Sequence, residues 1–134
     1  MLLSLDSELR RSVVLCIDDD EDVLECEKSF LESVGYTVLT ATSGGKGLEL
    51  ASRHSVDIVI VDYLMPEMNG HEVAIEIKRL KPQAPIIMLS AAVDVPEQAL
   101  KLVDAFIAKD SLASQLLPTI AQFARMPIDS SAFV

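Results

Sequence analysis

The sequence contains no tryptophan, and aromatic residues make up only 4% of its 134 positions. A core must therefore be built mainly from aliphatic side chains and methionine, and 50% of the residues are hydrophobic. Aliphatic, β-branched runs of this kind are typical of strands that are buried on both faces of a parallel sheet. This length and hydrophobic fraction suit one domain with a full core and leave little room for a second.

Basic residues are also few. The chain has 11 lysine and arginine residues against 21 aspartate and glutamate residues, which gives a formal net charge of −10. Modules that bind DNA or RNA carry a basic face for the phosphate backbone, so direct binding of nucleic acid is not expected. An acidic surface of this kind suits solubility or a basic partner.

Long apolar runs and a cysteine framework are missing as well. The apolar start of the chain is interrupted by Asp6 and Glu8, which makes it too short for the core of a signal peptide. No other stretch has the length of a membrane span, so we expect a cytoplasmic protein without membrane contact. Cys16 and Cys26 match no metal motif, and we expect Cys16, which lies in an apolar run, to be a buried free thiol.

Apolar runs alternate with segments of helical spacing along the whole chain. Five strands that alternate with five helices predict an α/β fold with a parallel sheet and helices on both of its faces. We expect an N-terminal extension over 1–12, a domain over 13–125 and a tail over 126–134. The predicted strands cover residues 13–17, 37–40, 58–61, 86–89 and 105–108, and the predicted helices cover residues 23–34, 47–54, 70–80, 96–103 and 112–125.

The helical spacing also predicts which side chains face the core. It places Val34 and Leu80 on the inner faces of the first and third helices. Gly44 and Gly45 are expected to form a loose start before the second helix, and Pro118 is expected to kink the last one.

Polar side chains follow four of the predicted strands directly. They are Asp18 and Asp19, Asp62, Ser90 and Lys109. Because the carboxyl ends of the strands meet at one edge of such a sheet, where ligands bind, these side chains should converge on one crevice. The sequence therefore predicts three carboxylates, a hydroxyl and an ammonium group at a single site.

Three carboxylates in one crevice repel each other, and a hard divalent cation relieves that repulsion. An aspartate is also a nucleophile that forms an aspartyl phosphate, a reaction that depends on positioning and charge neutralisation. The combination predicts phosphoryl chemistry at an aspartate of this crevice, with Mg²⁺, Lys109 and the hydroxyl group of Ser90 around the phosphoryl oxygens.

These motifs resemble a known family. Asp18 and Asp19 after an apolar strand are similar to the acidic pair of response-regulator receiver domains, the phosphoprotein modules of two-component and phosphorelay signal transduction. The segment DYLMPEMNG at 62–70 resembles their phosphorylation loop, in which an Asp is followed by Met-Pro and then by Gly. The resemblance covers about residues 13–125.

Two further positions fit the same family. Ser90 resembles its hydroxyl position, and Phe106, three residues before Lys109, resembles its switch aromatic. The resemblance implies a flavodoxin-like (βα)5 fold with strand order 2-1-3-4-5. It also implies that Lys109 pairs with the phosphoryl group and that Ser90 and Phe106 move inward as a switch. From the residues alone, Phe106 is equally compatible with an ordinary core position.

The resemblance further implies a cofactor and partners. The cofactor is Mg²⁺ or another divalent cation such as Mn²⁺. Its ligands are Asp62 as phosphoacceptor, Asp19, the backbone carbonyl of Leu64 and, largely through bound water, Asp18. The phosphodonor is a histidine kinase or a phosphotransfer protein, and the output goes to a downstream protein target. The domain assists its own phosphorylation and dephosphorylation, but it is a signalling domain and not an enzyme.

The sequence departs from the family in two places, and three alternative functions are open. Asp110 stands where receivers usually have Pro after the lysine, and the stretch between Ser90 and Lys109 is short. These departures favour a receiver-like adaptor that works without phosphate. A small Mg²⁺-dependent phosphatase would need a second Asp where Leu64 stands. A nucleotide-binding loop at 44–47 lacks the spacing of either glycine fingerprint.

Overall fold

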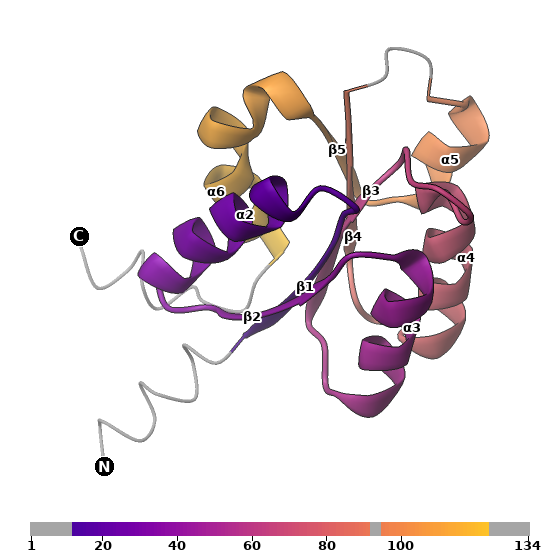
Figure 1. Cartoon of the computed structure of the whole chain (residues 1–134), viewed down its shortest axis with the longest axis horizontal. Coiled ribbons are helices and arrows are strands. Elements are labelled where there is room, and N and C mark those ends of the chain that lie inside the picture. Colours follow the sequence, from indigo (N-terminus) through magenta and orange to yellow (C-terminus); the bar gives the residue numbers. More distant parts are fainter. Residues whose placement is uncertain (1–11, 92–94, 124–134) are drawn as a thin grey trace.

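The computed structural model describes residues 12–91 and 95–123. In this part of the chain five strands form one parallel sheet in the order β2-β1-β3-β4-β5 (Figure 1). The fold class and the strand order are therefore confirmed. The strands are β1 (Val13–Ile17), β2 (Thr37–Ala41), β3 (Ile58–Asp62), β4 (Ile86–Ser90) and β5 (Ala105–Ala108).

Helices cover both faces of this sheet, as Figure 1 shows. The helices α2 and α6 lie on one face, and α3, α4 and α5 lie on the other. A turn of 3₁₀ helix, η1 (Lys109–Ser111), joins β5 to α6. The helices are α2 (Glu21–Ser33), α3 (Gly44–Arg53), α4 (Gly70–Leu80), α5 (Glu97–Leu102) and α6 (Leu112–Phe123).

The core lies in two layers, one on each side of the sheet. Every residue of the central strands β3 and β4 is buried, which explains why these segments are continuous apolar runs instead of alternating ones. Alternate strand residues point to opposite faces, so Ile58 and Ile60 pack under α2 and α6, whereas Val59 and Val61 pack under α3 and α4. The sheet is thereby fixed from both sides, and its carboxyl edge has a rigid base.

The start of α3 differs from the expectation. The helix begins at Gly44 and not at Gly47, because Ser43 caps it: its hydroxyl accepts a hydrogen bond of 3.2 Å from the backbone N–H of Lys46. Gly44 and Gly47 are both buried. A Cβ on Gly44 would lie 2.8 Å from Cγ2 of Val73, so the glycines here serve close helix packing and not a loose start.

The expected inner positions of Val34 and Leu80 are wrong. Val34 is 44% exposed and Leu80 is 45% exposed. Val34 is the C-cap residue that follows α2, and Leu80 is the last residue of α4, so both lie at the ends of their helices. Pro118 lies inside α6, which continues through it to Phe123.

Cys16 is a buried free thiol, as expected, whereas Cys26 is free and exposed. Among the residues described, no helix is long and apolar enough to cross a membrane.

Candidate functional site

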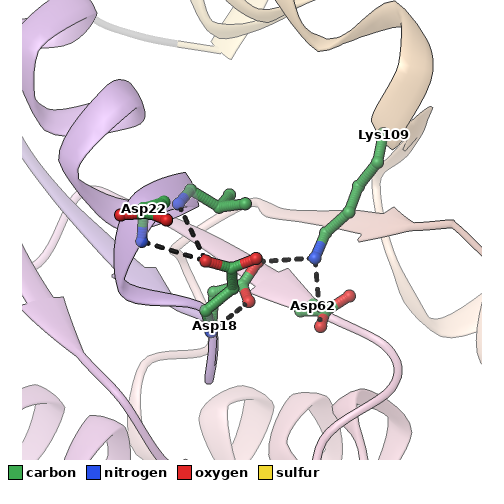
Figure 2. A network of polar contacts seen from close by, with 6 residues as sticks. Asp18, Asp22, Asp62 and Lys109 are labelled. Carbon is green, nitrogen blue, oxygen red and sulfur yellow. Dashed lines mark hydrogen bonds and ion pairs between the residues drawn. The ribbon is translucent and has the colours of Figure 1, made fainter.

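The first part of the site follows β1, which lies between β2 and β3. Asp18 comes directly after this strand and is 1% exposed. Its Oδ1 accepts a hydrogen bond of 2.9 Å from the backbone N–H of Asp20, which holds the carboxylate against the start of α2. Asp20 is the N-cap of that helix and accepts hydrogen bonds from Asp22 and Val23 (Figure 2). Asp19, between them, is exposed.

The second part is Asp62, the last residue of the neighbouring strand β3, which is 3% exposed. The loop after it folds back, and the N–H of Gly70 donates a hydrogen bond of 2.8 Å to the carbonyl of Tyr63. A Cβ on Gly70 would lie 2.5 Å from the backbone oxygen of Asp62, so only glycine lets α4 begin this close to the strand. Asn69 and Glu72 form a capping box that fixes this start.

Lys109 joins the two carboxylates. It follows β5, and its Nζ lies 3.0 Å from Oδ2 of Asp18 and 3.3 Å from Oδ2 of Asp62. Figure 2 shows the lysine reaching from its own segment to a point between the two acidic side chains. Three segments that are distant in the sequence thus meet at the carboxyl edge of the sheet, as the strand ends predicted.

The site has the charge and the donor atoms for a divalent cation. Carboxylate oxygens of Asp18, Asp19 and Asp62 lie within 4.8 Å of one another. Lys109 contributes one positive charge against these three carboxylates, so the cluster keeps an excess of negative charge. Oxygen ligands at this spacing fit a hard cation such as Mg²⁺ or Mn²⁺.

Burial and mutual repulsion also change how these groups titrate. Burial, and then the charge of Asp18, raise the pKa of Asp62 to about 6, against the attraction of Lys109. Burial and the charge of Asp19 raise the pKa of Asp18 as well, although the N–H of Asp20 and the ammonium of Lys109 oppose this. Burial lowers the pKa of Lys109, but Asp18 and Asp62 outweigh that effect and raise it overall. The carboxylates are therefore short of positive charge, which a bound cation supplies.

With this geometry established, comparison with known proteins decides the family. The family model of the response regulator receiver domain matches residues 14–121. The chain belongs to the response regulator receiver domain family. Phosphorylation of an aspartate and binding of Mg²⁺ are typical of receiver domains in two-component systems.

Two curated relatives of this receiver domain are regulators. It is 40% identical over 84 residues to the transcriptional regulatory protein GlrR of Escherichia coli K12, a match that covers 63% of this chain and 19% of GlrR. It is 38% identical over 78 residues to the response regulator SaeR of Staphylococcus aureus, which covers 58% of this chain and 34% of SaeR. The chain thus spans between about a fifth and a third of the length of these relatives.

Solved structures of other receivers have the same fold. The response regulator TrrA of Thermotoga maritima, in complex with Mg²⁺-BeF, superposes with a TM-score of 0.78 at 29% identity, over 84% of this chain and 98% of that one. A CheY-like receiver domain protein of Methanospirillum hungatei superposes with a TM-score of 0.80 at 28% identity, over 84% and 92% of the two chains.

The other residues that resemble receiver positions differ in their burial. Ser90 is the last residue of β4 and is 1% exposed, next to Leu89, which pairs with Asp62 in the sheet. Phe106 on β5 is 38% exposed and so does not occupy a core position. Leu64, two residues after Asp62, has an exposed side chain, which leaves its backbone as the part available to the site.

Asp110, the departure from the family pattern, is a surface residue. Its side chain is exposed, and its Oδ1 accepts a hydrogen bond of 3.4 Å from the hydroxyl of Ser111. It is not among the main groups that shift the pKa of Asp18, Asp62 or Lys109. The described residues contain no cis peptide bond, so the Lys109–Asp110 bond is trans.

One buried acidic residue, Glu27, is not indicated by any of the sequence motifs above. Glu27 on α2 is 1% exposed and faces the same core layer as Leu24 and Leu31. The spacing of these three residues places them on one face of a helix, so Glu27 interrupts an apolar stripe. The place of Glu27 within this apolar stripe, and not its residue type, could have indicated from the sequence that it is buried.

Proposed function

We propose that this receiver domain accepts a phosphoryl group on Asp62 and acts as a phosphorylation-dependent signalling switch. The observation that supports the proposal most strongly is the position of the Asp62 carboxylate. It lies at the end of the central strand β3, 3.3 Å from the ammonium of Lys109 and beside two further carboxylates. The phosphodonor we propose is a phosphohistidine on a histidine kinase or a phosphotransfer protein.

In the reaction, a carboxylate oxygen of Asp62 attacks the phosphorus atom of the phosphohistidine. The phosphorus–nitrogen bond breaks, and the imidazole nitrogen keeps the electron pair and takes up a proton. Lys109 then pairs with a phosphoryl oxygen, and the hydroxyl of Ser90 donates a hydrogen bond to another. Positioning and neutralisation of charge are the main contributions that a protein makes to this type of transfer.

The cofactor we propose is Mg²⁺, or another divalent cation such as Mn²⁺. Its ligands would be Asp19, Asp62 and the backbone carbonyl of Leu64, with Asp18 acting largely through bound water. Bound there, a cation would neutralise charge on the phosphoryl oxygens. The excess of negative charge around Lys109, and the raised pKa of Asp62, support a cation at this place.

For the output, we propose that Ser90 and Phe106 form the switch. Movement of Ser90 toward the phosphoryl group would leave room for Phe106, whose ring is now partly exposed, to turn inward. The name of GlrR says that it regulates transcription, and this chain spans 19% of its length. For this acidic chain itself we propose output through contact with a downstream protein and not through direct binding of DNA.

The experiment that tests this function is phosphorylation by a small phosphodonor in the presence of Mg²⁺, followed by intact-mass measurement. We expect one phosphoryl adduct on the wild-type protein, and none with Asp62→Asn or after removal of the metal. Asp57→Asn is the matched control, because Asp57 precedes the same strand at the opposite edge of the sheet, where its Oδ2 accepts a hydrogen bond from Val13. An adduct that persists in Asp62→Asn would contradict the proposal, as would the absence of an adduct on the wild type.

A further inference from the structure

Glu27 is an acidic side chain in a place that helices normally fill with apolar residues. It is 1% exposed, on the face of α2 that packs against β1 and β2. A carboxylate buried in this way is strongly disfavoured unless it is paired or neutral.

The surroundings of Glu27 provide no such pairing. Neither carboxyl oxygen has a hydrogen bond of good geometry in the described part of the chain. The Cys16 thiol on β1 is close enough to interact with the carboxyl, but a thiol is a weak donor. Glu27 is also not in an ion pair with any described residue, Lys109 included.

The charges of the acidic site nevertheless affect the pKa of Glu27. The groups that act on it are Asp18 at the end of β1, Asp62 on β3 and Lys109 in η1. From the other elements around this core layer, β2 contributes Val38, and α6 contributes Leu116 and Ile120. Burial raises the pKa of Glu27 to about 8, the charges of Asp18 and Asp62 act in the same direction, and Cys16 and Lys109 oppose them.

We propose that the buried carboxyl group of Glu27 is coupled to the acidic site: it carries a proton in the resting domain and releases it when a divalent cation binds beside Asp18, Asp19 and Asp62. The inference rests on the metal binding proposed above. A cation adds two positive charges at the place whose negative charges keep Glu27 protonated. Because linkage is reciprocal, deprotonation of Glu27 in turn favours the bound cation. The affinity for the cation therefore changes with pH even above the pH range in which exposed carboxyl groups ionise.

The test is calorimetric titration of the full chain with Mg²⁺ at pH 8, in two buffers with different ionisation enthalpies, which gives the number of protons released. We expect the wild type to release up to about 0.5 proton more than Glu27→Gln, because Glu27 is about half protonated at this pH. Between pH 7 and pH 9 the Mg²⁺ affinity of the wild type should rise by up to about threefold per pH unit, and that of the variant should stay flat.

Glu25→Gln is the matched control, because it makes the same substitution at an exposed residue of the same helix. It should release protons like the wild type. Glu27→Leu, which completes the apolar stripe, is a second variant that should behave like Glu27→Gln. Equal proton release by wild type and both Glu27 variants, with Mg²⁺ still bound, would overturn this inference and leave the proposed function intact. If the wild type binds no Mg²⁺, the metal site itself is wrong and the inference is overturned with it.

Discussion

The ammonium of Lys109 lies 3.0 Å from Oδ2 of Asp18, a buried carboxylate that follows a different strand. This ion pair holds positive charge inside the acidic cluster. A phosphoryl group on Asp62 would compete with Asp18 for the same ammonium. Lys109 is therefore expected to have two opposite effects. It should weaken the binding of a cation, and it should stabilise a phosphoryl group on Asp62.

The first prediction separates these two effects with Lys109→Met. Loss of the ammonium leaves three carboxylates without compensation, so Mg²⁺ should bind more tightly, as calorimetry would measure. Phosphorylation by a small donor should become roughly 10- to 100-fold slower, because a positioned charge on the phosphoryl oxygens is lost. Lys101→Met, at an exposed position on α5, should change neither quantity. A variant in which both quantities fall together would contradict the assignment.

The second prediction concerns the pH dependence of stability. In the unfolded chain Glu27 ionises near the ordinary value of 4.5, but in the folded protein its pKa is about 8. Between these values the folded protein binds more protons than the unfolded chain, so the free energy of unfolding should fall as the pH rises from about 5 to about 8. Asp62, with a pKa of about 6, adds to this fall in the lower half of the range only.

Glu27→Leu should therefore flatten the profile between pH 6.5 and pH 8 and stabilise the protein at pH 8 by on the order of 3 kcal/mol. Urea denaturation at a series of pH values measures this directly. The control is Glu25→Gln, which should keep the slope of the wild type. A Glu27→Leu variant with the wild-type slope would show that Glu27 is already ionised in the folded protein.

The third prediction compares two glycines of α3. A Cβ on Gly45 would meet nothing within 4 Å, so Gly45→Ala should stabilise the protein by about 0.5–1 kcal/mol through helix propensity. A Cβ on Gly47 would lie 2.7 Å from Cγ1 of Ile17, the residue before Asp18. Gly47→Ala should therefore destabilise the protein by about 1–3 kcal/mol. Thermal denaturation of both variants measures these changes. Equal shifts in their melting temperatures would mean that α3 packs less closely on β1.

The fourth prediction concerns the loop after Asp62. Glu67 has a φ of 71°, in the left-handed region that favours glycine and asparagine. Glu67→Asn should stabilise the protein by about 0.5 kcal/mol, and the β-branched Glu67→Val should destabilise it by about 1 kcal/mol or more. Chemical denaturation measures both changes. The opposite order of stability would show that this backbone conformation is not the one populated in solution.

The sequence was sufficient for the fold and for most of the cluster, because both follow from short-range rules. Apolar runs predicted the strands, and the residue after each run marked the edge where Asp18, Asp62 and Lys109 meet. Those rules do not predict how deeply a side chain is buried. They placed Leu80 on the inner face from its helical spacing, although it is the last residue of α4 and is 45% exposed.

Tertiary packing decides the other differences between prediction and structure. Glu27 is buried because α2 crosses β1 with that face inward, against the preference of a carboxyl group. Gly44 belongs to α3 because the cap by Ser43 and the contact with Val73 outweigh its weak helix propensity. Asp110 is exposed in η1 although it follows Lys109 directly, and no local pattern indicates this exposure.

The central claim is that Asp62 is the phosphoacceptor, and locating the modified residue tests it most directly. Borohydride reduces an acyl phosphate to an alcohol but leaves free carboxylates intact, so a phosphorylated aspartate becomes homoserine. After phosphorylation and reduction, peptide mass mapping should find homoserine at position 62 and aspartate at positions 18 and 19. Homoserine at position 18 or 19, or an unreduced Asp62 in protein that carries a phosphoryl adduct, would contradict the claim.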